Sequence, residues 1–330
     1  MELREFGPDD AKAIATFVEL DNARRVDAPW QHPATEFRRE MTMRYGWDGD
    51  LSPHYLAYVD GQPVGFLVIN TSTYDNPELA WLNFAVHPDV RRRGHGTALF
   101  DAASRLCREL ARPLVGADGG DTEQTRGFAA SVGLEHKSQS IHRRQHLREL
   151  PGGLIADLCA EAEKEAGEYE LVRVCGYSPE ELLEELAQVT MAINDAPMDA
   201  LEIDDEIYTP ERLRAYERAQ IEGGFRLYRL LARHRGTGEL AGHTVVTVAS
   251  EAPEIGDQHD TSVVRAHRGH RLGLLLKADL VRWLTGPGGP EPQLATIDTW
   301  NAESNDHMVA INERLGYRIL GRDLEFQRRV

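Results

Sequence analysis

Short alternating runs of apolar residues and longer runs with helical spacing follow one another in the same order twice along this chain. The short runs predict strands, and apolar residues three or four positions apart predict helices. In the first half these are strand, strand, strand, helix, strand, helix and strand, at residues 54–59, 63–70, 79–86, 97–111, 113–117, 122–133 and 135–146. In the second half, three strands, a helix, a strand and a helix lie at 225–233, 239–248, 260–264, 274–284, 294–301 and 303–316. The pattern predicts two copies of one α+β fold, offset by roughly 180 residues, rather than one large domain.

A segment rich in Ala and Glu separates the two copies. It covers residues 150–168 and opens on Pro and two Gly residues, which predicts a helical linker or a bridge between the two cores. We therefore predict an N-terminal domain at 1–149, this linker, and a C-terminal domain at 169–330. Each domain is expected to be a mixed, mostly antiparallel twisted sheet flanked by helices.

Composition limits the classes of partner. The chain has 330 residues, of which 41% are hydrophobic and 28% are charged, enough for two ordinary cores. Its 54 acidic and 37 basic residues give a net charge of -17, which argues against nucleic-acid and anionic-membrane partners. Three cysteines lack metal-ligand spacing and no apolar segment suits export or membrane insertion, so we expect reduced thiols, no metal and a cytoplasmic location. Whether the protein is a monomer or a homodimer stays open.

A basic, glycine-containing turn precedes the main helix of each copy. The turns read RRRGHG at 91–96 and HRGHRLG at 267–273. A strand that runs through such a turn into a helix presents unpaired backbone N–H groups and the positive end of the helix dipole, which together suit a pyrophosphate. Neither turn has the spacing of a Walker loop or of a dinucleotide-binding fingerprint.

The first turn resembles the R/Q-x-x-G-x-G/A signature of the GNAT superfamily, the acyl-CoA-dependent N-acyltransferases. Val86, Arg91, Gly94 and Gly96 carry the match, and the order of the predicted elements around them is also similar to the GNAT order. The second turn resembles a variant in which Arg271 stands where the first has Gly94. The resemblance covers nearly the whole chain, in a tandem layout similar to that of mycothiol synthase.

That resemblance implies acetyl-CoA as the cofactor and one binding region in each copy. In the second copy it implies contacts from Val263, Val264, Arg268, Gly269, His270, Arg271, Leu272, Gly273, Asn301 and Asn305. In the first copy it implies contacts from Val86, Arg91, Arg92, Arg93, Gly94, His95, Gly96 and Thr97. The tyrosine that often protonates the departing thiolate is missing, since Ala129 and Asn312 occupy the matching positions.

The second copy is the better candidate for catalysis. Transfer to an amine needs a proton acceptor near the strand that leads into the turn. Asp257 stands six residues before Val263, where some GNAT proteins have a catalytic carboxylate, while the first copy has Ala80 there. His259 follows on the same face if the strand already runs there. We predict a catalytic second half and a structural or regulatory first half, although Asp257 is equally compatible with an exposed loop.

An acidic segment at 194–206 follows the first predicted helix of the second copy. The resemblance places the acceptor site in this region, so Asn194, Asp195, Asp199 and Glu202 are candidate contacts for a cationic small-molecule amine. A solvated acidic loop explains the segment equally simply. The leading interpretation is transfer of an acetyl group to a primary amine by direct attack. The alternatives are a catalytically silent acyl-CoA or metabolite sensor, and an enzyme that uses another acyl-CoA.

Overall fold

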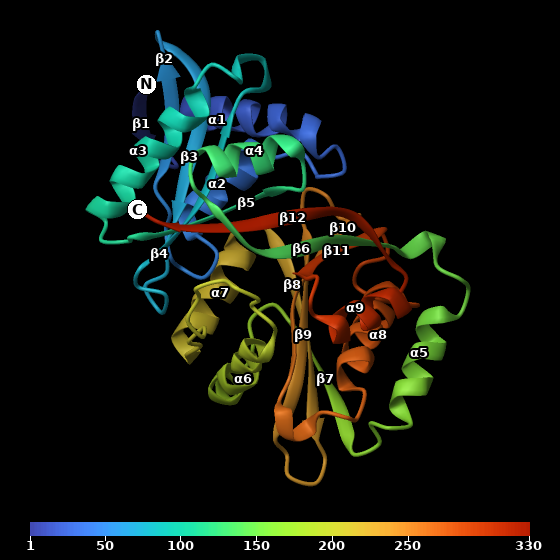
Figure 1. Ribbon diagram of the computed structural model, residues 1–330. Coiled ribbons are helices and arrows are strands. Elements are labelled where there is room, and N and C mark those ends of the chain that lie inside the picture. Colours follow the sequence, from blue (N-terminus) through green and yellow to red (C-terminus); the bar gives the residue numbers. More distant parts are fainter. The chain divides into compact units, whose positions relative to one another are not determined.

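The structure, a computed structural model, describes residues 1–330 and contains two compact units (Figure 1). Unit 1 comprises residues 1–140, 198–205 and 321–330, and unit 2 comprises residues 141–197 and 206–320. The end of each sequence copy thus belongs largely to the unit that the other copy builds. The division near residue 150 follows the sequence repeat and stays a prediction about the copies.

Unit 1 is a mostly antiparallel sheet with helices on both faces. Its strands are, in order across the sheet, β1 (Glu2–Phe6), β2 (His54–Val59), β3 (Gln62–Asn70), β4 (Leu79–Val86), β5 (Leu114–Gly120) and the end of β12 (Tyr317–Arg329). Its helices are α1 (Ala11–Ala23), α2 (Glu36–Tyr45), α3 (His95–Glu109) and α4 (Glu123–Ser131). Helix α1 buries Phe17 against Phe66 on one face, and α3 buries Leu99 and Phe100 on the other. Only β4 and β5 run parallel.

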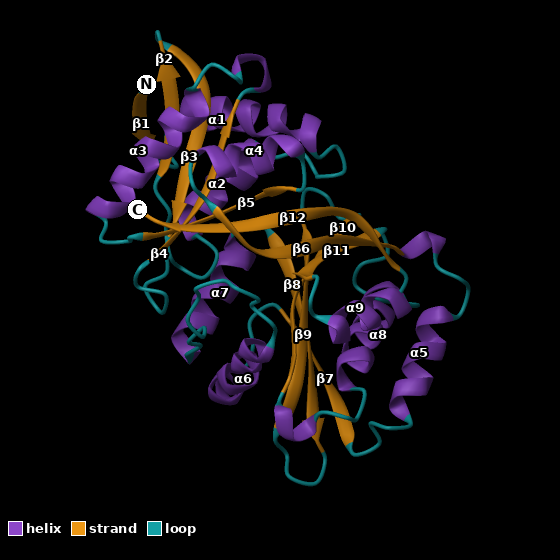
Figure 2. Ribbon diagram, in the orientation of Figure 1, coloured by secondary structure: helices purple, strands orange, loops and turns teal.

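Unit 2 repeats this plan. Its strands are, in order across the sheet, the end of β6 (Glu135–His146), β11 (Thr296–Ala302), β10 (Ile255–Val263), β9 (Leu240–Ala249), β8 (Phe225–His234) and β7 (Tyr169–Cys175). Its helices are α5 (Leu154–Glu163), α6 (Leu183–Thr190), α7 (Pro210–Glu222), α8 (Leu272–Thr285) and α9 (Asp306–Arg314). Figure 2 shows α6 and α7 on one side of the strands and α5, α8 and α9 on the other. We call the side that carries α6 and α7 the α7 face.

Helix α8 carries apolar residues on nearly every side, with Lys277 and Asp279 as buried exceptions, because two layers cover it. Its leucines pack on the sheet, and Leu158, Cys159 and Ala162 of α5 pack on its outer side in the same core cluster. A helix that is apolar all round is stable only when it is buried in this way. The helix predicted between the copies therefore exists at Leu154–Glu163, but it is a core element of unit 2 rather than a free linker.

The elements predicted from apolar periodicity are present. The strands predicted at 54–59, 79–86 and 135–146 have those limits in the structure, and the predicted helices shift by only a few residues. Strand β10 begins at Ile255 rather than at residue 260, because its first residues pair with β9 and β11 despite the nearby Gly256. None of the helices combines the length and the apolar character needed to cross a membrane.

Candidate functional site

The two basic turns share one backbone conformation. In the first copy the left-handed residues are Arg92 (φ 62°) and Gly94 (φ 81°). In the second copy they are Gly269 (φ 88°) and Arg271 (φ 55°), at the same two positions counted from Val86 and Val263. Each turn thus has one glycine and one arginine in the left-handed backbone conformation that glycine favours. The arginine comes first in the first turn, and the glycine comes first in the second. Arg271 does not change the shape of the second turn.

Both turns lead into helices whose N-termini lack a side-chain cap. Helix α3 begins after Gly94 and α8 begins after Arg271, and no side chain bonds the first N–H groups of either helix. A Cβ built on Gly94 or on Gly269 would meet nothing within 4 Å, so space lies beside both turns. Arg91 and Arg268 brace them alike, each donating Nε–H to a strand carbonyl at 3.1 Å. This arrangement fits an anion such as a pyrophosphate.

Acidic residues hold the basic side chains of the second turn. Asp195 accepts hydrogen bonds from Arg265 at 2.5 Å and from Arg268 at 2.6 Å. Arg271 pairs with Glu161 of α5, so its side chain lies along that helix. The side chains of Arg265, Arg268 and Arg271 are thus paired with acidic residues, whereas no side chain caps the first N–H groups of α8.

Asn305 is a helix cap in this structure. Its Oδ1 accepts the backbone N–H of Met308 at 3.1 Å, which satisfies an otherwise unpaired donor at the start of α9. Thr122 caps α4 in the same way, at 3.1 Å from the N–H of Thr125. Asn305 and Thr122 thus have the same structural role in the two copies, as the side chains that cap α9 and α4. Asn301 bonds the side chain of Asn312 at 3.1 Å, on the side of α9.

Parallel pairing ends early in both units. Strands β4 and β5 pair as far as Leu82 and Ala117, and β10 and β11 pair as far as Asp257 and Asp298. Beyond these residues the two strands of each pair no longer hydrogen-bond to each other, although both continue. An opening between adjacent strands follows, directly before the turn in each unit.

A β-bulge distinguishes the second opening from the first. The register of β10 against β9 shifts between Gln258 and Thr261, so one extra residue lies in β10. In a bulge two successive side chains oppose one residue of the partner strand. His259 and Asp260 therefore both project toward the α7 face, where His259 bonds Tyr216 of α7.

Asp260 is a carboxylate with a pKa near neutrality. Burial and then the nearby Glu206 carboxylate raise its pKa, Arg229 and Arg212 oppose the shift, and the resulting pKa is about 6. Asp260 remains partly accessible, and the structure gives its carboxylate no hydrogen-bond partner. A general base works best when its pKa lies close to the working pH.

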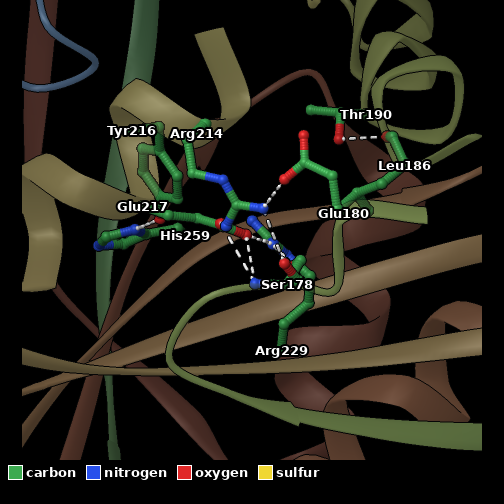
Figure 3. Close-up of polar contacts among 9 residues, drawn as sticks. All are labelled: Ser178, Glu180, Leu186, Thr190, Arg214, Tyr216, Glu217, Arg229 and His259. Atoms are coloured by element: carbon green, nitrogen blue, oxygen red, sulfur yellow. Dashed lines mark hydrogen bonds and ion pairs between the residues drawn. The ribbon is translucent and has the colours of Figure 1, made fainter. Parts of the chain in front are cut away.

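His259 is held neutral beside this carboxylate. Its Nδ1 lies 2.5 Å from the Tyr216 hydroxyl (Figure 3). Its Nε2 lies 3.2 Å from Thr247 Oγ1. Burial, followed by the charge of Arg229, lowers the pKa of His259 to about 3. Such an imidazole accepts a proton poorly at neutral pH, so it suits an orienting role.

A buried ion pair anchors α7 behind the site. Arg229 is 1% exposed and pairs with Glu217, which is fully buried. Figure 3 shows the same Glu217 carboxylate reached by Arg214 and by the backbone N–H of Ser178, both within 3.2 Å. Several bonds to one buried carboxylate are required to offset its desolvation. They fix α7, and with it Tyr216, over β10.

The first unit lacks this chemistry. Strand β4 pairs with β3 without a register shift, and Asn83 stands where the second copy has Asp260, three residues before the aligned valine. Arg24 donates to the Asn83 side chain at 3.1 Å. An amide cannot act as the proton acceptor, which favours unit 2 as the catalytic unit.

Because of the bulge, the residue of the first copy that corresponds to Asp257 is not the one that sequence counting gives. Asp257 pairs with Thr247, which lies five residues after Gly242, the partner of Val263. Trp81 pairs with Asn70, which likewise lies five residues after Gly65, the partner of Val86. Trp81, rather than Ala80, is thus the counterpart of Asp257, because counting along the sequence ignores the extra residue. Asp257 projects to the same face as His259, as predicted.

The four residues predicted for the acceptor site are not gathered together. Asp199 and Glu202 belong to unit 1, where Ser138 and Arg329 bond them. Asp195 pairs with the basic turn, as described above. Asn194 holds the backbone N–H and C=O of Glu206 at 2.9 Å, and so positions the carboxylate that acts on Asp260.

Comparisons with known proteins agree with this geometry. Residues 17–119 match the model of the "Acetyltransferase (GNAT) family". A solved "tandem GNAT protein from the clavulanic acid biosynthesis pathway" aligns with a TM-score of 0.80 and 23% identity, over 99% of this chain and 98% of that one. The chain has a tandem GNAT fold, and its residues 17–119 match the GNAT family. A GCN5-related N-acetyltransferase of Sphaerobacter thermophilus aligns with a TM-score of 0.67 and 19% identity, over 99% and 95% of the two chains.

Curated relatives of this chain match part of its length. The mycothiol acetyltransferase of Mycolicibacterium vanbaalenii is 34% identical over 98 residues, which are 30% of this chain and 31% of that protein. The mycothiol acetyltransferase of a Mycobacterium species (strain JLS) is 33% identical over 106 residues, or 31% and 34% of the two chains. The match thus spans about a third of the length of these relatives.

Proposed function

We propose that the protein transfers an acetyl group from acetyl-CoA to the primary amine of a small molecule, and that unit 2 performs the reaction. The observation that carries the proposal is Asp260, an accessible carboxylate with a pKa of about 6 beside the opening between β10 and β11. The GNAT match and the mycothiol acetyltransferase relatives support the reaction class and a small-molecule acceptor.

The second turn would hold the pyrophosphate of CoA. Space beside Gly269 and the uncapped N-terminus of α8 fit this group, and Arg265 and Arg268 would exchange Asp195 for phosphate oxygens. Acetyl-CoA supplies an acetyl group activated as a thioester. The first turn has the same conformation and is proposed to bind CoA without catalysis or to serve a structural or regulatory role.

Asp260 would remove the proton from the acceptor amine. An ammonium has no lone pair, so the nitrogen must lose a proton before it attacks the acetyl carbonyl carbon. The C–N bond forms, the C–S bond breaks, and the electron pair leaves with the CoA sulfur. The first ammonium proton stays on the Asp260 carboxyl, and the second proton, which the nitrogen loses as the amide forms, passes through solvent to the CoA thiolate. Because Glu206 adds a second negative charge nearby, a cationic amine is favoured over a neutral alcohol.

His259 and Tyr216 would set the shape of this site rather than exchange protons. Neutral His259 is fixed between Tyr216 and Thr247, which keeps one wall of the site rigid. The buried Arg229 next to it lowers the pKa of Asp260, which keeps that carboxylate ionised at neutral pH. A preorganised site of this kind pays no reorganisation free energy during the reaction.

The direct test is thiol release. Purified protein is mixed with acetyl-CoA and a panel of primary amines, and free CoA is followed with a thiol reagent. Amine-dependent release that is lost on changing Asp260 but kept on changing Asn83 supports the proposal. Binding of acetyl-CoA and of a non-reactive desulfo analogue by calorimetry, without release from any amine, would instead establish a sensor. Faster release from a longer acyl-CoA would replace acetyl by that group.

A further inference from the structure

Trp300 of β11 exposes an indole ring near the proposed site. Its side chain is 49% exposed, although it belongs to a strand whose neighbours Asp298 and Thr299 are buried. One face of the indole stacks on the His142 ring, with centroids 4.0 Å apart and planes 12° from parallel. The opposite face is therefore the one that solvent reaches.

A buried network holds this ring pair in place. His142 is 2% exposed, and its Nε2 lies 3.0 Å from Asp298 Oδ2. Arg144 donates to both oxygens of the same carboxylate, at 2.6 and 2.7 Å. Burial opposes ionisation of Asp298, but its hydrogen bonds with Arg144 and His142 keep its pKa below the ordinary value. A tryptophan supported in this way is rigid, which lowers the entropy lost when a ligand stacks on it.

The strand register places Trp300 on the same face as the proposed base. Asp298 pairs with Asp257, Asp257 pairs with Thr247, and Thr247 contacts His259 on the α7 face. Paired residues project to one face of a sheet, and so do residues two apart in a strand. Trp300 thus lies about 7 Å beyond the last paired residue of β11, across the opening from Asp260.

The first unit has no such platform. Trp81 pairs with Gly116, just as its counterpart Asp257 pairs with Asp298. Asp118 lies two residues after Gly116, and Trp300 lies two residues after Asp298, so Asp118 is the counterpart of Trp300. Asp118 accepts a hydrogen bond from Trp81 Nε1 at 2.7 Å, and the Trp81 ring lies over Gly116. At this strand position, only the unit with the carboxylate base carries an open, supported aromatic face.

We propose that Trp300 is a specificity-determining residue, on which the flat face of a ring in the acceptor amine stacks while the amine reaches Asp260. The proposal rests on the acetyl transfer proposed above. An aromatic ring and a sugar ring share the chemistry it requires, since both offer a flat surface of π electrons or C–H bonds to an indole. An acyclic amine offers no such surface, and an acyclic amine therefore gains nothing from Trp300.

The test compares Trp300→Leu and Trp300→Phe with three amines, namely tyramine, glucosamine and n-butylamine. Stacking lost in Trp300→Leu should raise the KM of the ring-bearing substrate about 3- to 10-fold with kcat little changed. Trp300→Phe should keep most of the affinity. The KM for acetyl-CoA and the rate with n-butylamine should not move. Whichever of tyramine and glucosamine responds identifies the kind of ring.

Trp47→Leu is the matched control, because Trp47 is an exposed tryptophan of unit 1. Three outcomes would overturn the proposal. Trp300→Leu could weaken the reaction with n-butylamine as much as the reaction with a ring-bearing amine, or Trp47→Leu could have as large an effect as Trp300→Leu. The third outcome is an unchanged KM for both ring-bearing amines in Trp300→Leu. If wild type releases no thiol with any amine, the acetyl transfer itself fails. Calorimetry of the same amines then tests the Trp300 proposal separately. The proposal requires a ring-bearing amine to bind more tightly to wild type than to Trp300→Leu.

Discussion

Replacing Asp260 with Asn is the sharpest test of the catalytic proposal, because the first copy already has Asn83 at this place. The change keeps the shape of the side chain and removes its ability to take a proton. Loss of a positioned general base lowers rates by about 10²- to 10⁴-fold. We expect kcat to fall within that range and the KM for acetyl-CoA to stay within about twofold, since Asp260 does not contact the turn.

The pH profile of the wild type carries the same information. With a pKa of about 6, the Asp260 carboxyl is ionised in most molecules at pH 7.5. At pH 5 about a tenth of the molecules keep the ionised form, so kcat/KM should fall about tenfold between these pH values. Asp260→Asn should lose this dependence on pH along with its activity.

Stability separates lost chemistry from a lost fold. The folded-state pKa of Asp260 lies above that of an unfolded aspartate, so ionised Asp260 destabilises the folded state as the pH rises from about 4 through about 6. Asn removes this penalty, and the free energy of unfolding of Asp260→Asn should exceed that of wild type at pH 8 by up to about 3 kcal/mol. The two proteins should be equally stable below about pH 4, where wild type is protonated.

Thiol release from pH 5 to 8.5 and urea unfolding at pH 4 and 8 measure these effects. Asp260→Asn with near-normal kcat and an unchanged pH profile refutes the role of Asp260 as base. A less stable Asp260→Asn at pH 8 contradicts the electrostatic argument, whatever the activity.

Three further predictions concern the turns and the buried ion pair. Gly273→Glu should abolish thiol release by filling and charging the start of α8, whereas Gly94→Glu should leave the rate within about twofold; the reverse result would assign catalysis to unit 1. Arg229→Met should lower the free energy of unfolding in urea by about 3–5 kcal/mol, because the buried Glu217 carboxylate loses its buried cationic partner. The double variant Arg229→Met with Glu217→Leu should recover most of this loss. Arg271→Gly should raise the free energy of unfolding by about 1 kcal/mol by relieving its positive φ, with the KM for acetyl-CoA changed less than about threefold. A large rise in that KM would show that the Arg271 side chain binds phosphate.

Two features of the site could be predicted from the sequence, and the orientation of Asp260 could not. The turn and its helix are local, so a run of Arg, His and Gly between a strand and a helix was enough to predict them. His259 was found because it lies near the strand before the turn. Asp260 stands beside it, yet alternation along a regular strand assigns it to the opposite face. Only the bulge, which depends on how β9 pairs, turns it toward the α7 face.

The partners of these residues come from distant parts of the chain. Tyr216 reaches His259 across 43 residues, and His142 meets Asp298 across 156 residues. No periodicity relates such positions, and the acidic segment that pattern alone favoured is divided between the two units. The pKa of Asp260 is likewise set by burial and by Glu206 and Arg229, not by its sequence neighbours.

The sequence by itself determined the duplicated α+β plan and the two basic turns before the main helices, because apolar periodicity and turn chemistry are local properties of the chain. Tertiary structure decided which strands end in which unit, which copy has a carboxylate with a raised pKa beside the strand opening, and where an aromatic face stays open to solvent. These depend on strand register, on a single extra residue in one strand, and on charges brought together by folding.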